Sequence, residues 1–113
     1  MPYKKRVNAI VDKSFYFACD IVNFCKVLKD KKEYEIAHQL LKSGTSIGAN
    51  IRESQSGVSK KDFKNKLGIS LKEAEETSFW LDVLEETTTN IPNDLQKKCE
   101  ELIKLLVSII KNS

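Results

Sequence analysis

The segment 43–53, Ser-Gly-Thr-Ser-Ile-Gly-Ala-Asn-Ile-Arg-Glu, constrains the fold most, because helical spacing and small residues coincide in it. Its apolar positions continue a repeat of three and four residues, which predicts an amphipathic helix. Gly44 and Gly48 lie inside this helix, where each glycine costs about 1 kcal/mol relative to alanine. Tertiary contacts must offset that cost, and the missing side chains let a second helix come close. We therefore expect this helix to pack tightly against a neighbour.

The same segment does not have the features of a phosphate-binding loop. A P-loop needs Gly-Lys-Ser or Gly-Lys-Thr after a strand, and neither the lysine nor the strand is present. Small residues also interrupt the apolar repeat further along the chain, at Ser70, Ala74 and Thr77. We interpret Ser70, Ala74 and Thr77 as the surface that faces the glycines. The glycines would then pack against the third predicted helix, 60–86.

Four segments follow a helical repeat and are separated by polar breaks: 7–29, 33–54, 60–86 and 93–111. Gly57 suits a helix end, Ser59 with Asp62 predicts a capped start of the third helix, and Pro92 is expected near the start of the fourth. The 113 residues include only four glycines and two prolines, too few for a sheet protein with many tight turns. The sequence predicts an all-α, antiparallel up-down-up-down four-helix bundle that forms one domain over 1–113.

Charge and hydropathy limit the class of protein. Lysine and arginine number 19 and aspartate and glutamate 16, so the net charge of +3 is a weaker bias than dedicated nucleic-acid binders show. No apolar run approaches the ~18 residues needed to cross a bilayer. The basic N-terminus is followed by alternating apolar and polar residues, unlike a signal peptide. We expect a cytoplasmic protein without a membrane partner.

The cysteines and the histidine do not form a metal-binding pattern. Cys19, Cys25 and Cys99 contain no CxxC pair, which predicts reduced, buried thiols. A di-iron bundle needs more than one Glu-x-x-His pair, and His38 is the one histidine of the chain. We expect no metal ion and no cofactor.

A polar cluster is predicted on the flank of the second and third helices, and its members are Ser46, Asn50, Glu53, Glu73 and Glu76. The first three are spaced i, i+4 and i+7, which places them on one side of a helix. A buried asparagine must find hydrogen-bond partners. We interpret the cluster as a structural network that fixes helix register. The alternative is a small-ligand or catalytic pocket built from Asn50, Glu53, Glu73 and Glu76.

Three apolar residues, Phe79, Trp80 and Val83, fall away from the apolar stripe of the third helix at about 100° per residue. Aromatic residues on the outer face of a helix often mark a partner contact. They are our candidate interface of a homo-oligomer. The alternative is that they lie under the loop 87–92.

The start of the third helix carries the candidate nucleic-acid contact, Lys60, Lys61 and Lys64. Lysines grouped in this way neutralise phosphates, and their binding weakens as salt rises. Acidic residues are expected to dilute the field of these lysines: Glu33, Glu35, Asp62, Glu73, Glu75 and Glu76. The alternative is an ordinary solvated face.

Four blocks, taken in order, carry a resemblance to a known family: 43–53, 59–63, 70–77 and the pair Trp80-Leu81. They resemble the bacterial four-helix-bundle family named after open reading frames in intervening sequences of 23S ribosomal RNA genes. The resemblance implies an antiparallel bundle that assembles into a ring-like homo-oligomer, a pentamer. A related protein is the accessory variability determinant of diversity-generating retroelements, which forms such a barrel and assists a reverse transcriptase with nucleic acid.

The chain departs from the family's usual pattern at Arg52 and Ser54, where small residues are common, and at Glu75, where asparagine is common. The retroelement relative is also markedly more basic than this chain. The wider family has no established enzymatic activity, so the resemblance favours a non-enzymatic scaffold or adaptor that contacts RNA, DNA or a nucleic-acid enzyme. The alternative is a ligand-binding or enzymatic bundle that uses the polar cluster.

Overall fold

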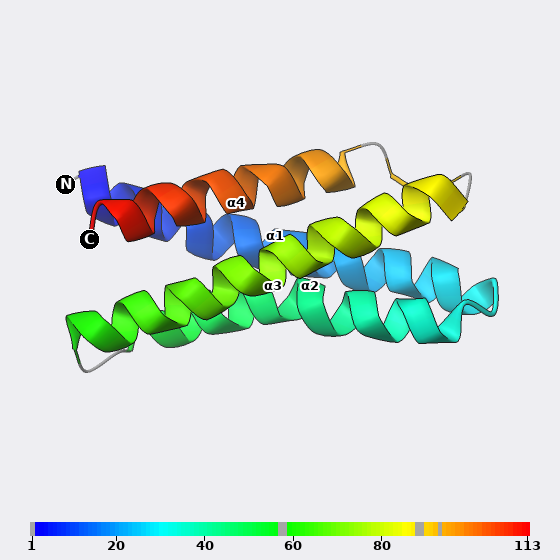
Figure 1. Cartoon of the computed structure of the whole chain (residues 1–113), viewed down its shortest axis with the longest axis horizontal. Helices are drawn as coiled ribbons and strands as arrows, with labels where there is room; N and C mark the ends of the chain where they lie inside the picture. The colour runs from blue at the N-terminus through cyan, green and yellow to red at the C-terminus, as the bar shows by residue number, and fades with distance from the viewer. Residues whose placement is uncertain (1, 57–58, 88–89, 93) are drawn as a thin grey trace.

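The computed structural model describes the backbone of residues 2–56, 59–87, 90–92 and 94–113 and, within these ranges, the side chains from residue 8 onward. This part of the chain forms four helices: α1 (Pro2–Asp30), α2 (Tyr34–Ser54), α3 (Lys60–Thr87) and α4 (Leu95–Lys111). They run up and down along a bundle of 44 × 22 × 18 Å, with both termini at the same end (Figure 1). The predicted all-α four-helix bundle is confirmed.

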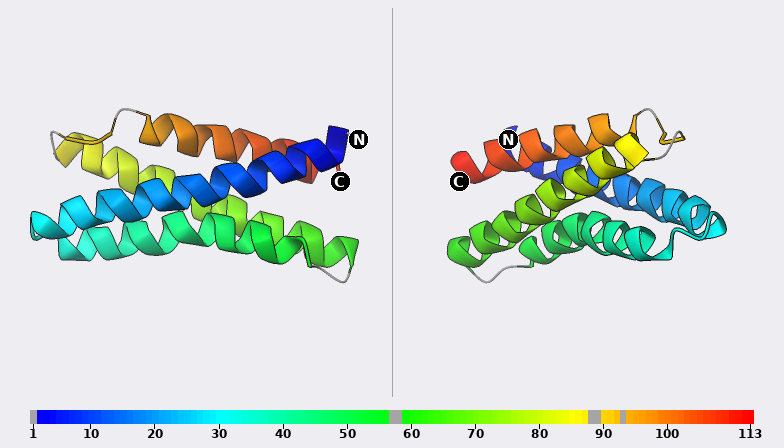
Figure 2. Two further views of the ribbon diagram at one scale, coloured as in Figure 1. Left: turned by 180° about the vertical axis from the view of Figure 1, so that it is seen from behind. Right: turned by 45° about the vertical axis from the view of Figure 1, so that its right-hand side comes forward.

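Each helix packs against two neighbours. α2 contacts α1 and α3, and α4 closes the bundle by contacting the same two helices. Seen from behind, α1 and α2 lie side by side on one face (Figure 2). This arrangement leaves α1 and α3 on opposite corners of the bundle, as expected for successive antiparallel helices.

The turn between α1 and α2 is a Schellman motif. The N–H of Glu33 donates to the carbonyl of Leu28, and the N–H of Lys32 donates to the carbonyl of Lys29, both at 2.9 Å. Lys32 has a φ of 65°, which is the left-handed conformation this motif requires. The turn is therefore held by the carbonyl groups that the end of α1 leaves unpaired.

α3 begins at its predicted cap. The N–H of Asp62 donates to Ser59 Oγ at 3.1 Å, as the capping pattern requires. The helix end expected at Gly57 lies outside the described residues. Pro92 precedes α4, and its carbonyl accepts a hydrogen bond from the N–H of Leu95 at 3.2 Å.

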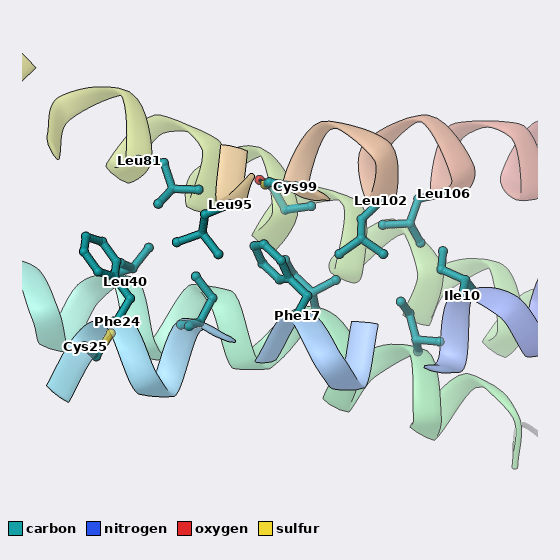
Figure 3. Close-up of a cluster of buried hydrophobic side chains, with 14 of the residues drawn as sticks. Ile10, Phe17, Phe24, Cys25, Leu40, Leu81, Leu95, Cys99, Leu102 and Leu106 are labelled. Atoms are coloured by element: carbon teal, nitrogen blue, oxygen red, sulfur yellow. Dashed lines mark hydrogen bonds between the residues drawn. The ribbon is translucent and has the colours of Figure 1, made fainter. Parts of the chain in front are cut away.

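A continuous hydrophobic core runs along the bundle. Phe17 and Phe24 of α1 reach between the helices, where Leu40, Leu81 and Leu95 approach from the other three (Figure 3). These five side chains are at most 4% exposed. Burying a side chain of this size contributes about 1.5–3 kcal/mol relative to leaving it in water, so the core supplies the main stabilising term.

The glycines of α2 pack against α1, and not against α3 as the sequence suggested. A Cβ at Gly44 would lie 2.8 Å from Ile21 Cγ2, and one at Gly48 would lie 3.2 Å from the carbonyl oxygen of Ser14. The residues of α2 that face α3 are Ser43 and Ile47, which directly precede the two glycines in the chain. The prediction of a close helix contact at the glycines is confirmed, but the prediction that the partner helix is α3 is wrong.

Hydrogen bonds join α2 to α3 on a different face of α2 from the glycine contacts with α1. Thr77 Oγ1 donates to Ser43 Oγ at 2.9 Å, and Ser70 Oγ donates to the carbonyl of Ile47 at 2.9 Å. The three hydroxyl residues are buried. Because an unpaired buried hydroxyl is costly, these bonds favour one register between the helices.

We predict opposite effects for alanine at two glycines. Gly44→Ala should lower the free energy of unfolding by about 1–3 kcal/mol, because its Cβ overlaps the buried Ile21. Gly68→Ala should raise it by about 0.5–1 kcal/mol, because no atom lies within 4 Å and alanine favours the helix. Urea unfolding followed by circular dichroism measures both. A Gly44→Ala protein as stable as the parent would contradict the close approach of α1 and α2.

Candidate nucleic-acid interface

The fold separates charge along the long axis of the bundle. Residues 8–15, 46–56, 59–72 and 104–113 lie at the end that holds both termini, which we call the basic end (Figure 1). They contain nine lysine and arginine residues and three acidic residues. Residues 16–45, 73–87, 90–92 and 94–103 form the acidic end, with seven basic and thirteen acidic residues. The modest net charge of the chain therefore conceals two ends of opposite sign.

The three lysines predicted as a nucleic-acid contact lie at the basic end. Lys60, Lys61 and Lys64 are exposed on the first turns of α3, and they form no ion pair within the described residues. Cations at the N-terminus of a helix oppose its dipole, and Asp62 is the one acidic residue of this first turn. These lysines therefore lower the stability of the helix that carries them.

The sequence reading missed the residues that the fold adds to these lysines. The other basic side chains of this end are Lys13, Arg52, Lys66, Lys72, Lys104 and Lys111. Lys66 Nζ bonds Glu53 Oε1 at 3.0 Å, and Lys13 pairs with Glu101. Summing charge over segments that an up-down bundle brings together would have found this end, whereas inspecting clusters one by one did not.

The acidic residues expected to dilute the field lie mostly at the other end. Of the six, Asp62 is the one that belongs to the basic end. The other five lie in 16–45 or 73–103. Glu73, Glu75 and Glu76 lie near the middle of α3, directly after Lys72, so the expected dilution stays a prediction there.

The predicted polar cluster bonds mainly within single helices. Ser46 Oγ donates to the carbonyl of Lys42 at 2.6 Å, and Asn50 Nδ2 donates to the carbonyl of Ser46 at 2.8 Å. Glu53 reaches α3 through Lys66. The hydroxyl-mediated bonds between α2 and α3 come instead from Ser43, Ser70 and Thr77, which were not assigned to the cluster.

Two carboxylates of the cluster, Glu73 and Glu76, lie on α3 near its middle, and the third, Glu53, lies on α2 at the basic end. Burial raises the pKa of Glu73, and the like charge of Glu76 raises it further. Both effects disfavour the charged form of Glu73. Asn50, Glu73 and Glu76 line neither the hollow beside Trp80 nor the hollow beside Phe15.

The candidate oligomer residues form an aromatic surface at the acidic end. Phe79 is 57% exposed and meets Trp80 edge to face, with the ring centroids 5.2 Å apart. Trp80 and Val83 are half-buried. Trp80 Nε1 is buried and has no hydrogen-bond partner in the described part of the chain. The exposure of Phe79 disfavours the alternative in which the loop 87–92 covers it.

Trp80 also borders a hollow of 590 Å³ at the start of α2. Glu35 and His38 line it and form a Glu-x-x-His pair. In the part of the chain that the structure describes, no group of three or more His, Cys, Asp or Glu side chains is placed to hold a metal ion. The pair therefore lacks the additional ligands of a di-iron bundle.

The cysteines differ from one another in exposure. Cys25 and Cys99 are buried as predicted, but Cys19 is exposed, so the prediction is wrong for that residue. Cys25 Sγ donates to the carbonyl of Ala37 at 3.4 Å, and Cys99 Sγ donates to that of Ala74 at 3.3 Å. Burial raises the pKa of Cys25 to about 11 and that of Cys99 to about 12.

The sequence model of the 23S rRNA-intervening sequence protein family matches residues 6–108. The fold is similar to a crystal structure of a protein of unknown function from the S23 ribosomal protein family of Bacteroides thetaiotaomicron VPI-5482. The two share 45% sequence identity with a TM-score of 0.89, over 94% of this chain and 98% of that one. No curated protein gives a significant match. None of the described helices is long and apolar enough to span a membrane.

We predict that iodoacetamide modifies the native protein at pH 8 on Cys19 and spares Cys25 and Cys99. The buried thiols are protonated as well as inaccessible, because their pKa values exceed the ordinary value of 9.0. As pH rises above 9, the unfolded chain loses these protons first, so stability should fall between pH 9 and 11. Peptide mass spectrometry locates the label. Equal labelling of the three thiols in the folded protein would contradict the burial of Cys25 on α1 and of Cys99 on α4.

Proposed function

Because this chain belongs to the 23S rRNA-intervening sequence protein family, we propose that it works by binding, as a self-assembling scaffold whose basic end contacts the phosphates of nucleic acid. The observation that carries the proposal is the separation of charge along the bundle. The proposal includes the cytoplasmic location that the cysteine pattern of the sequence predicted.

Screening makes the separation of charge effective. The Debye length at physiological salt is about 8 Å, whereas the bundle is 44 Å long. A polyanion at the basic end therefore experiences mainly the local excess of lysine and arginine, because the carboxylates that lie more than a Debye length away are largely screened. Binding would release condensed counterions from the phosphates, which is the main sequence-independent contribution to affinity.

Lys60, Lys61 and Lys64 suit this role because they are exposed and unpaired in the described structure. The N-terminus of α3 adds a partial positive charge beside them. Lysine presents a point charge on a flexible stem, so these residues would contact phosphates without reading base sequence. Their cost to helix stability is compensated when an anion binds.

Self-assembly is the second part of the proposal. The aromatic surface of Phe79, Trp80 and Val83 exposes apolar area that a second copy would cover. A partner acceptor would also satisfy the indole N–H of Trp80. This surface lies at the acidic end, so it would leave the basic end open. The family resemblance implies that the assembly is a ring of five copies.

The alternative function, a ligand-binding or enzymatic bundle built on Asn50, Glu53, Glu73 and Glu76, has less support. Asn50 is bonded within its own helix, and the carboxylate of Glu53 is neutralised by Lys66. A catalytic carboxylate pair needs an open site between its members. We therefore favour binding over catalysis.

We predict that the variant Lys60→Glu/Lys61→Glu binds a short fluorescent RNA more weakly than the parent does. Two phosphate contacts are lost, so the slope of log K against log salt should fall by about 2. Fluorescence anisotropy at several salt concentrations measures both affinity and slope. The matched control is Lys31→Glu/Lys32→Glu, which makes the same charge change at the acidic end.

The control variant should keep the affinity and the salt slope of the parent. An equal loss in both variants would mean that net charge, and not the basic end, governs binding. A parent protein that does not bind RNA or DNA at low salt would refute the nucleic-acid part of the proposal.

For self-assembly, we predict that Phe79→Asp/Val83→Asp reduces the mass in solution to that of the 12.9 kDa chain. Burying two carboxylates against a partner without compensation is strongly unfavourable. Size-exclusion chromatography with light scattering gives the mass, and Val107→Asp, at an exposed apolar position of α4, is the control. A parent protein that is monomeric at micromolar concentration would refute self-assembly.

A further inference from the structure

Phe15 and Arg52 form an exposed pair of side chains on the face formed by α1 and α2. Tyr16, which follows Phe15 in the chain, instead lines a hollow between α1 and α4. Phe15 is 47% exposed and Tyr16 is 66% exposed, and their ring centroids are 5.3 Å apart. Arg52 Cζ lies 5.7 Å from the centroid of the Phe15 ring. Both Phe15 and Arg52 belong to the basic end. Aromatic rings interleaved with cations are typical of surfaces that bind single-stranded nucleic acid.

A hollow of 320 Å³ opens beside this pair. The small residues Ala18, Gly48 and Ala49 form part of its lining, and Phe15 and Arg52 border it. Sites for small organic groups usually occupy about 300–1,000 Å³, so the hollow has room for a flat ring but for little more. Its formation follows from the close approach of α2 to α1 at Gly48.

The charges of this hollow favour an anionic chain that carries flat rings. Arg52 forms no ion pair within the described residues, whereas the one carboxylate in the lining, Glu53, is bonded by Lys66 at 3.0 Å. The guanidinium of Arg52 is therefore available to an anionic ligand, and the charge of Glu53 is balanced by Lys66. Thr45 also lines the hollow, and its hydroxyl donates to the carbonyl of Leu41 at 2.7 Å. With few polar groups left to read base edges, the hollow would discriminate little among bases.

We propose that this hollow receives an unpaired base of single-stranded RNA or DNA, stacked against Phe15 and the guanidinium of Arg52. The adjoining phosphates would run towards the lysines at the start of α3. This inference rests on the proposed function, and it adds a preference for single strands. The bases of a duplex are stacked on one another and cannot enter such a hollow.

The test compares one labelled strand alone and annealed to its complement, using the full chain. Phe15→Leu keeps an apolar side chain but removes the aromatic face, and it should weaken binding of the single strand about tenfold and leave duplex binding unchanged. Arg52→Lys keeps the charge but loses the planar group, so it should also weaken binding of the single strand relative to the duplex. Tyr34→Leu, an aromatic that is 59% exposed at the acidic end, is the control.

A strand containing 2-aminopurine reports stacking directly, because its fluorescence is quenched on an aromatic surface. Quenching by the parent and not by Phe15→Leu is the expected result. If Phe15→Leu binds and quenches like the parent while Lys60→Glu/Lys61→Glu loses affinity, this inference fails and the proposed function stands. If neither strand form binds the parent, both fail. A change in the mass of the assembly caused by Phe15→Leu would assign Phe15 to a subunit interface and overturn the inference.

Discussion

The close approach of α2 to α1 at Gly44 and Gly48 sets the geometry of the rest of the bundle. It fixes the rotation of α2 about its axis, because a side chain at either position would meet Ile21 or the backbone of Ser14. Successive residues of a helix are about 100° apart, so this rotation directs Ser43 and Ile47 towards α3. Arg52 follows Gly48 by one turn, which brings its guanidinium over Phe15. The glycines thus determine both the hydrogen bonds to α3 and the contact between Arg52 and Phe15 of α1.

Antiparallel topology has an equally direct effect on charge. The end of α2 and the start of α3 return to the end of the bundle where the chain begins and finishes (Figure 1). Lysines that are far apart in sequence are gathered there, and most acidic residues are carried to the opposite end. Gathering like charges destabilises a folded protein through self-repulsion, and an anionic partner relieves that repulsion. A fold optimised for stability alone would have mixed the two signs.

The sequence predicted the helices well because hydrophobic periodicity and capping are local properties. The Ser59 cap and the buried stripes of α2, α3 and α4 were predicted from spacing alone. Periodicity gives the face that a helix buries but not the neighbour that covers it, so the glycines were assigned to α3 instead of α1. Exposure of Cys19 was missed for the same reason. The charge separation and the contact between Arg52 and Phe15 both require the chain to be folded back on itself, and local spacing does not contain that information.

The central claim about this bundle is that its two ends have different partners. Photochemical cross-linking of the native protein to RNA, followed by peptide mass spectrometry, tests this claim most directly. We expect cross-linked peptides from residues 8–15, 46–72 and 104–113, together with Ala18 and Thr45 of the hollow beside Phe15. Cross-links concentrated in the rest of 16–45 and in 73–103, or spread evenly over both ends, would contradict this expectation.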